Sequence, residues 1–82
     1  MIRRYMDAAM ARATYELLSE DGTFYGGIPV CPGVYAAGET LEACRISLEE
    51  VLEEWILIRI YRRLPIPEVD GIRIEVKAEE VA

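Results

Sequence analysis

With 82 residues, the chain is long enough for one domain, and a domain of this size buries only a thin core. Its formal net charge of −6, from 15 acidic and 9 basic residues, argues against nucleic-acid binding across the whole surface, because phosphate contacts need clustered Lys and Arg. A basic partner protein fits this charge better. The chain has no His, the commonest general base and transition-metal ligand, so we expect a protein without enzymatic activity, cofactor or bound metal.

Apolar residues make up 52% and charged residues 29% of the chain, which is typical of an ordered, soluble domain. Cys31 and Cys44 are too few for a disulfide scaffold or a zinc site, and we expect both in or near the core. The N-terminus lacks the continuous apolar run of a signal peptide, and no stretch approaches membrane-spanning length. We therefore expect a cytoplasmic protein.

The N-terminal residues predict a short amphipathic helix at residues 2–12. One side of this helix carries Tyr5, Met6, Ala9 and Met10. A helix this short is not stable alone, so it must dock on its own sheet or on a neighbouring subunit. A frayed tail is the alternative.

A β-hairpin is predicted next, from residues 13–19 and 23–28. The first of these stretches alternates its side chains between two faces, as a strand does. Asp21 and Gly22 form the turn, since glycine takes a positive φ at little cost. Gly26 has no side chain in the second strand, which predicts either a bulge or the close approach of another element.

A third strand is predicted at residues 34–39, after a turn at Pro32 and Gly33. Gly38 then permits a sharp bend into the helix that follows.

The longest predicted element is a helix at residues 40–63, whose first turn the Thr40 hydroxyl can cap. Its apolar residues recur every three or four positions in a stripe made of Leu41, Cys44, Leu48, Val51 or Leu52, Trp55 and Ile58. From residue 55 to 61 only Arg59 is polar, so one sheet face cannot cover this half of the helix, and a second copy of the chain, in a dimer or tetramer, is the simplest cover. The interface candidates are Trp55, Ile56, Tyr61 and Leu64, and burial of all four in the chain's own core is the alternative.

The two prolines of residues 64–67 end this helix, and residues 72–77 alternate apolar and charged side chains as a fourth strand does. The predicted fold class is therefore α+β: a short N-terminal helix, a three-stranded antiparallel meander, a long helix packed on one sheet face and a fourth strand. The predicted spatial strand order is 3-2-1-4. The chain forms one domain, with the N-terminal helix at 1–12, the α+β core at 13–77 and a tail at 78–82.

Four short motifs follow one another along the chain: DGTFYGGIP at residues 21–29, PGV at 32–34, GETLEA at 38–43 and IP at 66–67. In this order and spacing they resemble the HicB-type antitoxin family, in its UPF0150-like short form. The resemblance covers residues 13–67. It implies a partly degraded ribonuclease-H-like fold and a role in binding and blocking HicA, a small basic toxin that cleaves messenger RNA.

Two features depart from the pattern of the family. Ala43 replaces the second acidic residue of the family's helix start, which removes the capping box and costs some helix stability without touching function. Many members also carry a C-terminal DNA-binding segment, whereas only a few residues follow the strand at 72–77 here. We therefore do not expect this chain to bind an operator.

Four glutamates, Glu49, Glu50, Glu53 and Glu54, crowd two adjacent turns of the long helix with no Lys or Arg four positions further on. We interpret them as an electrostatic docking surface for the basic toxin. An ordinary solvated helix face is the alternative.

A ribonuclease-H-like fold also raises the question of a metal-dependent nuclease, which needs several converging carboxylates. The candidates are Glu16, Asp21 and Glu42, but a strand, a turn and a helix start do not bring them together, so no catalytic or metal site is assigned. Tyr25 and Tyr35 could line a groove beside the turn at residues 29–33. We assign it no ligand, because strand tyrosines usually pack at the rim of a sheet.

The sequence therefore predicts an antitoxin of a type II toxin–antitoxin system, which neutralises a HicA-type mRNA interferase by direct binding and steric occlusion. The alternative is a stand-alone homo-oligomeric domain of the same fold that binds a small ligand or another protein and has no toxin partner.

Overall fold

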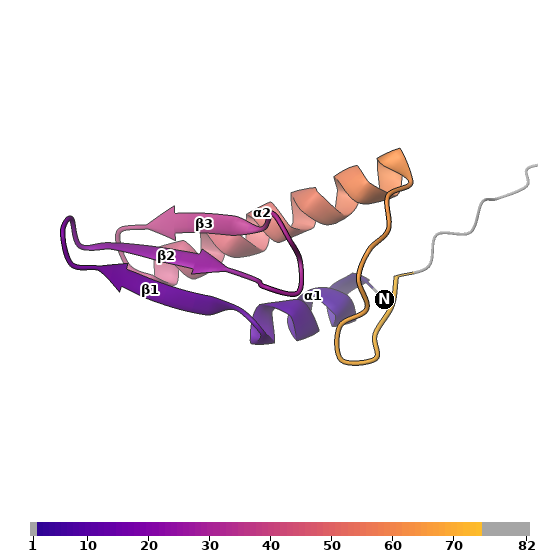
Figure 1. The fold of residues 1–82 in the computed structure, drawn as a ribbon, viewed down its shortest axis with the longest axis horizontal. Helices are drawn as coiled ribbons and strands as arrows, with labels where there is room; N and C mark the ends of the chain where they lie inside the picture. Colours follow the sequence, from indigo (N-terminus) through magenta and orange to yellow (C-terminus); the bar gives the residue numbers. More distant parts are fainter. Residues whose placement is uncertain (1, 75–82) are drawn as a thin grey trace, which may run out of the picture.

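A computed structural model describes residues 2–74 of the chain (Figure 1). This part contains two helices and a three-stranded antiparallel sheet, which confirms the predicted α+β class. In chain order the elements are α1 (Ile2–Ala11), β1 (Thr14–Leu18), β2 (Thr23–Gly27), β3 (Tyr35–Gly38) and α2 (Leu41–Arg62). α2 packs across one face of the sheet and runs on past its end, where α1 lies alongside (Figure 1).

The β1–β2 hairpin forms where the sequence predicts it. Thr14 pairs with Gly27 at the open end and Leu18 with Thr23 at the turn. Gly22 takes a φ of 70°, and the Asp21 carboxylate accepts a hydrogen bond from the Thr23 backbone N–H at 3.0 Å. The side chain of Asp21 and the left-handed backbone of Gly22 therefore build this turn together.

The connection between β2 and β3 turns at Pro32 and Gly33, where Gly33 has a φ of 97°. Ile28 donates its backbone N–H to the Val34 carbonyl at 3.2 Å, which continues the antiparallel pairing of the two strands beyond their ends. The resulting order of strands is β1-β2-β3.

The predicted fourth strand is not confirmed. Ile72 forms an isolated bridge with Val69 instead of pairing with β1, and residues 75–77 lie outside the described residues. Only the first three strands of the predicted order 3-2-1-4 are therefore confirmed.

The sheet and α2 approach each other closely at two glycines. A Cβ atom on Gly26 would lie 3.1 Å from the Cys44 Sγ atom, and a Cβ atom on Gly38 would lie 2.5 Å from the Cys44 backbone nitrogen. A Cβ atom on Gly26 would also lie 2.9 Å from the Tyr15 ring of β1, so close approach of α2 and of this ring, and not a bulge, accounts for the glycine. Gly38 was expected to permit a bend, but it also leaves room for the first turn of α2.

The start of α2 is capped as predicted, because the Thr40 hydroxyl accepts a hydrogen bond from the Ala43 N–H at 3.0 Å. The predicted apolar stripe is only partly correct. The residues of α2 that are fully buried are Cys44, Leu48, Leu52 and Ile56, whereas Leu41 and Ile58 are 48% and 47% exposed. A spacing of four residues moves around the helix by about 40° at each step. The buried stripe drifts in this way because the N-terminal half of α2 faces the sheet and its C-terminal half faces α1.

The core lies where α1, α2 and two connecting segments meet. α1 contributes Tyr5, Met6 and Ala9, which confirms the predicted apolar side of this helix. It docks mainly on α2 of its own chain, not on the sheet. The other buried members of this cluster are Ile28, Cys31, Val34, Leu48, Leu52, Ile56 and Val69.

Tyr5 ties the segment after α2 to this core. Its side chain is fully buried, and its hydroxyl donates a hydrogen bond to the Pro67 carbonyl at 2.6 Å. Burial raises the pKa of Tyr5 well above its ordinary value, with a further contribution from the hydrogen bond to Cys31. The neutral phenol is therefore the form that holds residue 67 against α1.

Tyr5→Phe should lower the free energy of unfolding by about 1 kcal/mol, because the carbonyl of Pro67 loses its buried donor. Urea denaturation followed by circular dichroism measures this change. Tyr35→Phe is the control, since Tyr35 is 71% exposed and should leave the stability unchanged. Equal stabilities of Tyr5→Phe and the parent chain would contradict this role of the hydroxyl.

Candidate protein-binding surfaces

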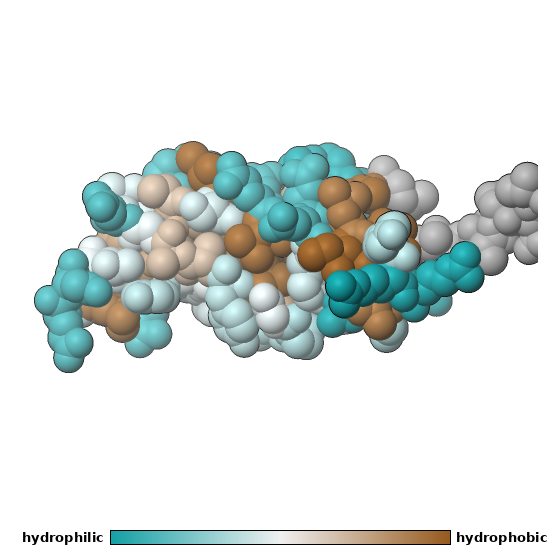
Figure 2. Space-filling view, turned by 90° about the horizontal axis from the view of Figure 1, so that it is seen from above, coloured by the Kyte–Doolittle hydropathy of each residue, from teal (hydrophilic) through white to brown (hydrophobic). Residues whose placement is uncertain are grey.

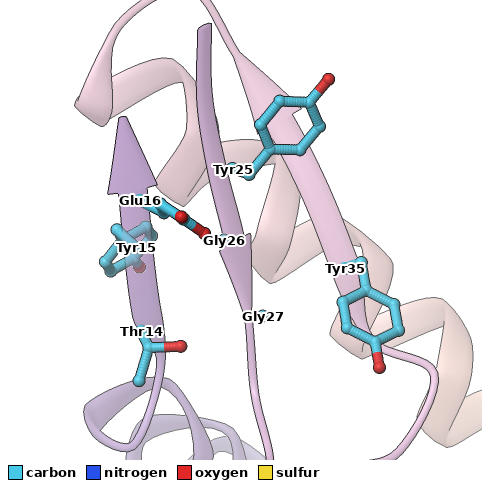
Figure 3. Close-up of a pocket in the computed structure, with 7 residues that line it drawn as sticks. All are labelled: Thr14, Tyr15, Glu16, Tyr25, Gly26, Gly27 and Tyr35. Carbon is cyan, nitrogen blue, oxygen red and sulfur yellow. The ribbon is translucent and has the colours of Figure 1, made fainter. Parts of the chain in front are cut away.

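The face of the sheet that α2 leaves open has a shallow hollow of about 410 Å³. Alternation along the strands turns Tyr15 and Gly26 toward α2 and sends their neighbours outward. The residues that line the hollow are Thr14, Tyr15, Glu16, Tyr25, Gly26, Gly27 and Tyr35 (Figure 3). We call this site the outer-face hollow.

The strand register brings the polar and aromatic side chains of the outer-face hollow together. Glu16 of β1 is paired with Tyr25 of β2, and Gly27 of β2 is paired with Tyr35 of β3. Figure 3 shows Glu16 reaching across from β1 toward β2, with the rings of Tyr25 and Tyr35 on the far side of the two glycines. The sequence suggested a groove with the two tyrosines beside the turn at residues 29–33, to which no ligand was assigned, whereas the hollow lies on the open face of the sheet and includes Glu16. The association of Glu16 with the tyrosines needs the strand register.

The four glutamates of α2 are not equivalent. Glu50, Glu53 and Glu54 are exposed, as a docking surface requires. Glu49 is half-buried and lies 3.0 Å from the Arg3 guanidinium of α1 and 3.8 Å from that of Arg45. Arg45 lies one turn earlier on α2 and Arg3 lies on another helix, so neither partner was predicted from basic residues further along the helix.

The three carboxylates considered for a metal site, Glu16, Asp21 and Glu42, do not form a metal-binding cluster in the described part of the chain. Among residues 2–74, no group of three or more His, Cys, Asp or Glu side chains lies close enough to hold a metal ion. Glu42 accepts a hydrogen bond from Arg45 at 2.8 Å, and this bond lowers the pKa of Glu42. Asp21 is used in the hairpin turn, which leaves Glu16 in the outer-face hollow.

The interface candidates of the long helix separate into core and surface residues. Ile56 is fully buried in the core of its own chain, so it cannot contact a second copy and is corrected to a core residue. Trp55 is half-buried; its indole N–H donates to the Pro32 carbonyl at 3.0 Å, and Arg59 lies 4.5 Å above its ring. Trp55 thus holds the turn between β2 and β3 against α2.

The remaining candidates lie on an exposed apolar surface. Tyr61 is 86% exposed and Leu64 is 43% exposed, and two further residues of α2, Leu57 and Ile58, are about half-exposed. We call these four residues the helix-end patch. Figure 2, which looks down on the molecule from above, shows hydrophobic residues gathered toward the C-terminal half of α2. Clusters of large exposed apolar side chains are typical of contact surfaces.

Comparison with known proteins shows the family to which this chain belongs. Residues 4–67 match the model of the family described as UPF0150-like, and the chain belongs to this family. This confirms the resemblance to the UPF0150-like form. Among solved structures, the chain is similar to the crystal structure of TTHA0281 from Thermus thermophilus, with 41% sequence identity and a TM-score of 0.86. The similarity covers 93% of this chain and 94% of that chain. A search of curated proteins finds no match.

Neither helix in the described part of the chain combines the length and the apolar character needed to cross a membrane.

Proposed function

We propose that the chain is an antitoxin that binds a small basic toxin of the HicA type and blocks its RNA-cleaving site sterically. Membership of the UPF0150-like family, which is related to HicB, supports this proposal. The observation that carries it is the distribution of charge. Between Arg12 and Arg45 the chain has no Lys or Arg, and it carries acidic side chains at Glu16, Glu20, Asp21, Glu39 and Glu42. All three strands lie within this stretch.

An acidic sheet layer suits a basic partner in two ways. Opposite charges accelerate the encounter of the two proteins, and like charges disfavour wrong partners. The exposed Glu50, Glu53 and Glu54 extend the negative surface onto α2. Blocking needs no chemistry from this chain, since a protein bound over the catalytic face of the toxin keeps RNA out.

The partly degraded ribonuclease-H-like fold is part of the same proposal. Three antiparallel strands followed by a long helix on one face agree with it. A strand at residues 72–77 beside β1 would complete it.

The proposal predicts that the product of a neighbouring gene for a small basic protein co-purifies with this chain after co-expression. Because charge steers the association, the affinity should fall as the salt concentration rises. Size-exclusion chromatography and titration calorimetry at low and high salt measure both effects. Separate elution of the two proteins at micromolar concentration would contradict the proposal.

A second candidate function is a stand-alone homo-oligomeric domain of the same fold, which binds a small ligand or another protein and has no toxin partner. The helix-end patch favours it, because large exposed apolar side chains are stabilised by contact with a second copy. Self-association is also compatible with the antitoxin, so the co-purification of a basic protein separates the two candidates.

Replacing Leu57 and Tyr61 with Ser should lower the average mass of the chain in sedimentation experiments if the helix-end patch joins two copies. Both side chains are exposed, so the melting temperature should change little. Leu41→Ser is the matched control, since Leu41 is similarly exposed at the other end of α2. An unchanged sedimentation profile for the double variant would exclude the patch as the interface.

A further inference from the structure

We propose that the outer-face hollow holds an arginine side chain of the basic partner, with Glu16 as the ion-pair acceptor and the rings of Tyr25 and Tyr35 beside the guanidinium. This inference rests on the proposed function, because it names the surface through which the basic partner is bound. It also shifts the main contact from the glutamates of α2 to the open face of the sheet.

The hollow depends on two consecutive glycines in β2. A Cβ atom on Gly27 would lie 3.1 Å from the Cδ1 atom of Tyr35, so the tyrosine ring occupies the place of a side chain at residue 27. Gly26 turns its missing side chain toward α2 and exposes only its backbone on the open face. The floor of the hollow is therefore the backbone of the two glycines, with the Tyr35 ring packed against Gly27, and the sides are Thr14 and Glu16 on one edge and the two tyrosines on the other (Figure 3).

The chemistry of the walls favours a flat cation. A carboxylate accepts two parallel N–H donors from a guanidinium, and aromatic rings attract a cation that lies near their faces. Arginine fits such a site better than lysine, because its charge is spread over a plane that can pair and stack at once. Within this chain, the Arg59 guanidinium already lies over the Trp55 ring, 4.5 Å from its centroid.

The charge around the hollow also favours a cation from outside the chain. In the part of the chain that the structure describes, Glu16 forms no ion pair, whereas Glu42 and Glu49 are both paired with Arg45. Near the ends of the strands, Glu20, Asp21 and Glu39 are acidic, and the nearby basic side chain of Arg12 is already paired with Asp70. This negative charge would repel an anionic ligand. An arginine from the partner can pair with the Glu16 carboxylate without displacing a basic residue of this chain.

The glutamates of α2 lack this combination of groups. Glu50, Glu53 and Glu54 are exposed on a helix surface without a hollow, and Glu49 is already neutralised by two arginines. They contribute long-range attraction. The outer-face hollow supplies the short-range contact.

The test uses a short peptide in which arginine alternates with glycine, and two matched peptides with citrulline or lysine in place of arginine. Citrulline keeps the shape of arginine and removes its charge. In two-dimensional NMR of the ¹⁵N-labelled chain, the arginine peptide should shift the amide signals of Glu16, Gly26, Gly27 and Tyr35. The citrulline peptide should not shift them, and the lysine peptide should bind more weakly.

Glu16→Gln and Tyr35→Ala should each weaken binding of the arginine peptide by about tenfold, as expected for the loss of a charge-assisted hydrogen bond or a stacked ring. Both residues are exposed, so the variants should fold, and circular dichroism checks this. Glu68→Gln is the matched control, because Glu68 is exposed in the segment after α2 and belongs to neither acidic surface, and this variant should bind the peptide as the parent chain does. Parent-like affinity of both Glu16→Gln and Tyr35→Ala, or equal binding of the citrulline peptide, would overturn the inference.

The same variants separate this inference from the proposed function. If the basic partner protein binds the parent chain and both variants equally well, the hollow is not the contact and the antitoxin proposal stands. If the partner protein fails to bind the parent chain, the antitoxin proposal fails, and the peptide titration still decides whether the hollow binds arginine.

Discussion

The first turn of α2 packs directly against two glycines of the sheet. At Gly26 and Gly38 the helix comes so close that a Cβ atom would meet the Sγ atom or the backbone of Cys44. This close approach fixes which face of a small sheet is covered. The other face is left open, and the glycine at residue 27 keeps its middle free of side chains. The contact on the inside therefore explains which face stays open, and Gly27 with the Tyr35 ring shapes the hollow on that face.

The same arrangement separates the molecule into regions of different surface chemistry. The sheet layer carries acidic residues and no basic ones between Arg12 and Arg45, whereas the arginines lie on the two helices and in the segment after them. α2 runs past the sheet to pack on α1, and this extension leaves Leu57 and Tyr61 on the surface (Figure 1). An acidic sheet face and an apolar helix end can then serve two contacts without competing for one surface.

Features set by neighbouring residues were predictable, and features set by distant ones were not. The hairpin turn at Asp21 and Gly22 and the cap at Thr40 depend on hydrogen bonds within three residues, so the sequence reveals them. The burial of Ile56 depends on where α1 docks, and the partners of Glu49 include an arginine 46 residues away. Likewise, the neighbourhood of Glu16 and Tyr25 follows from a strand register that no local pattern fixes. The apolar side of α1 was predictable from the spacing of its residues, but the element on which α1 docks was not.

The open face of the sheet is the proposed contact surface for the basic partner. Nitration of tyrosines with tetranitromethane, read by mass spectrometry with and without that partner, tests this contact. In the free chain Tyr25 and Tyr35 should react and the buried Tyr5 should not. The bound partner should protect Tyr25 and Tyr35 without a matching loss of reaction at Tyr61. Undiminished nitration of Tyr25 and Tyr35 in a chain saturated with the partner would contradict it.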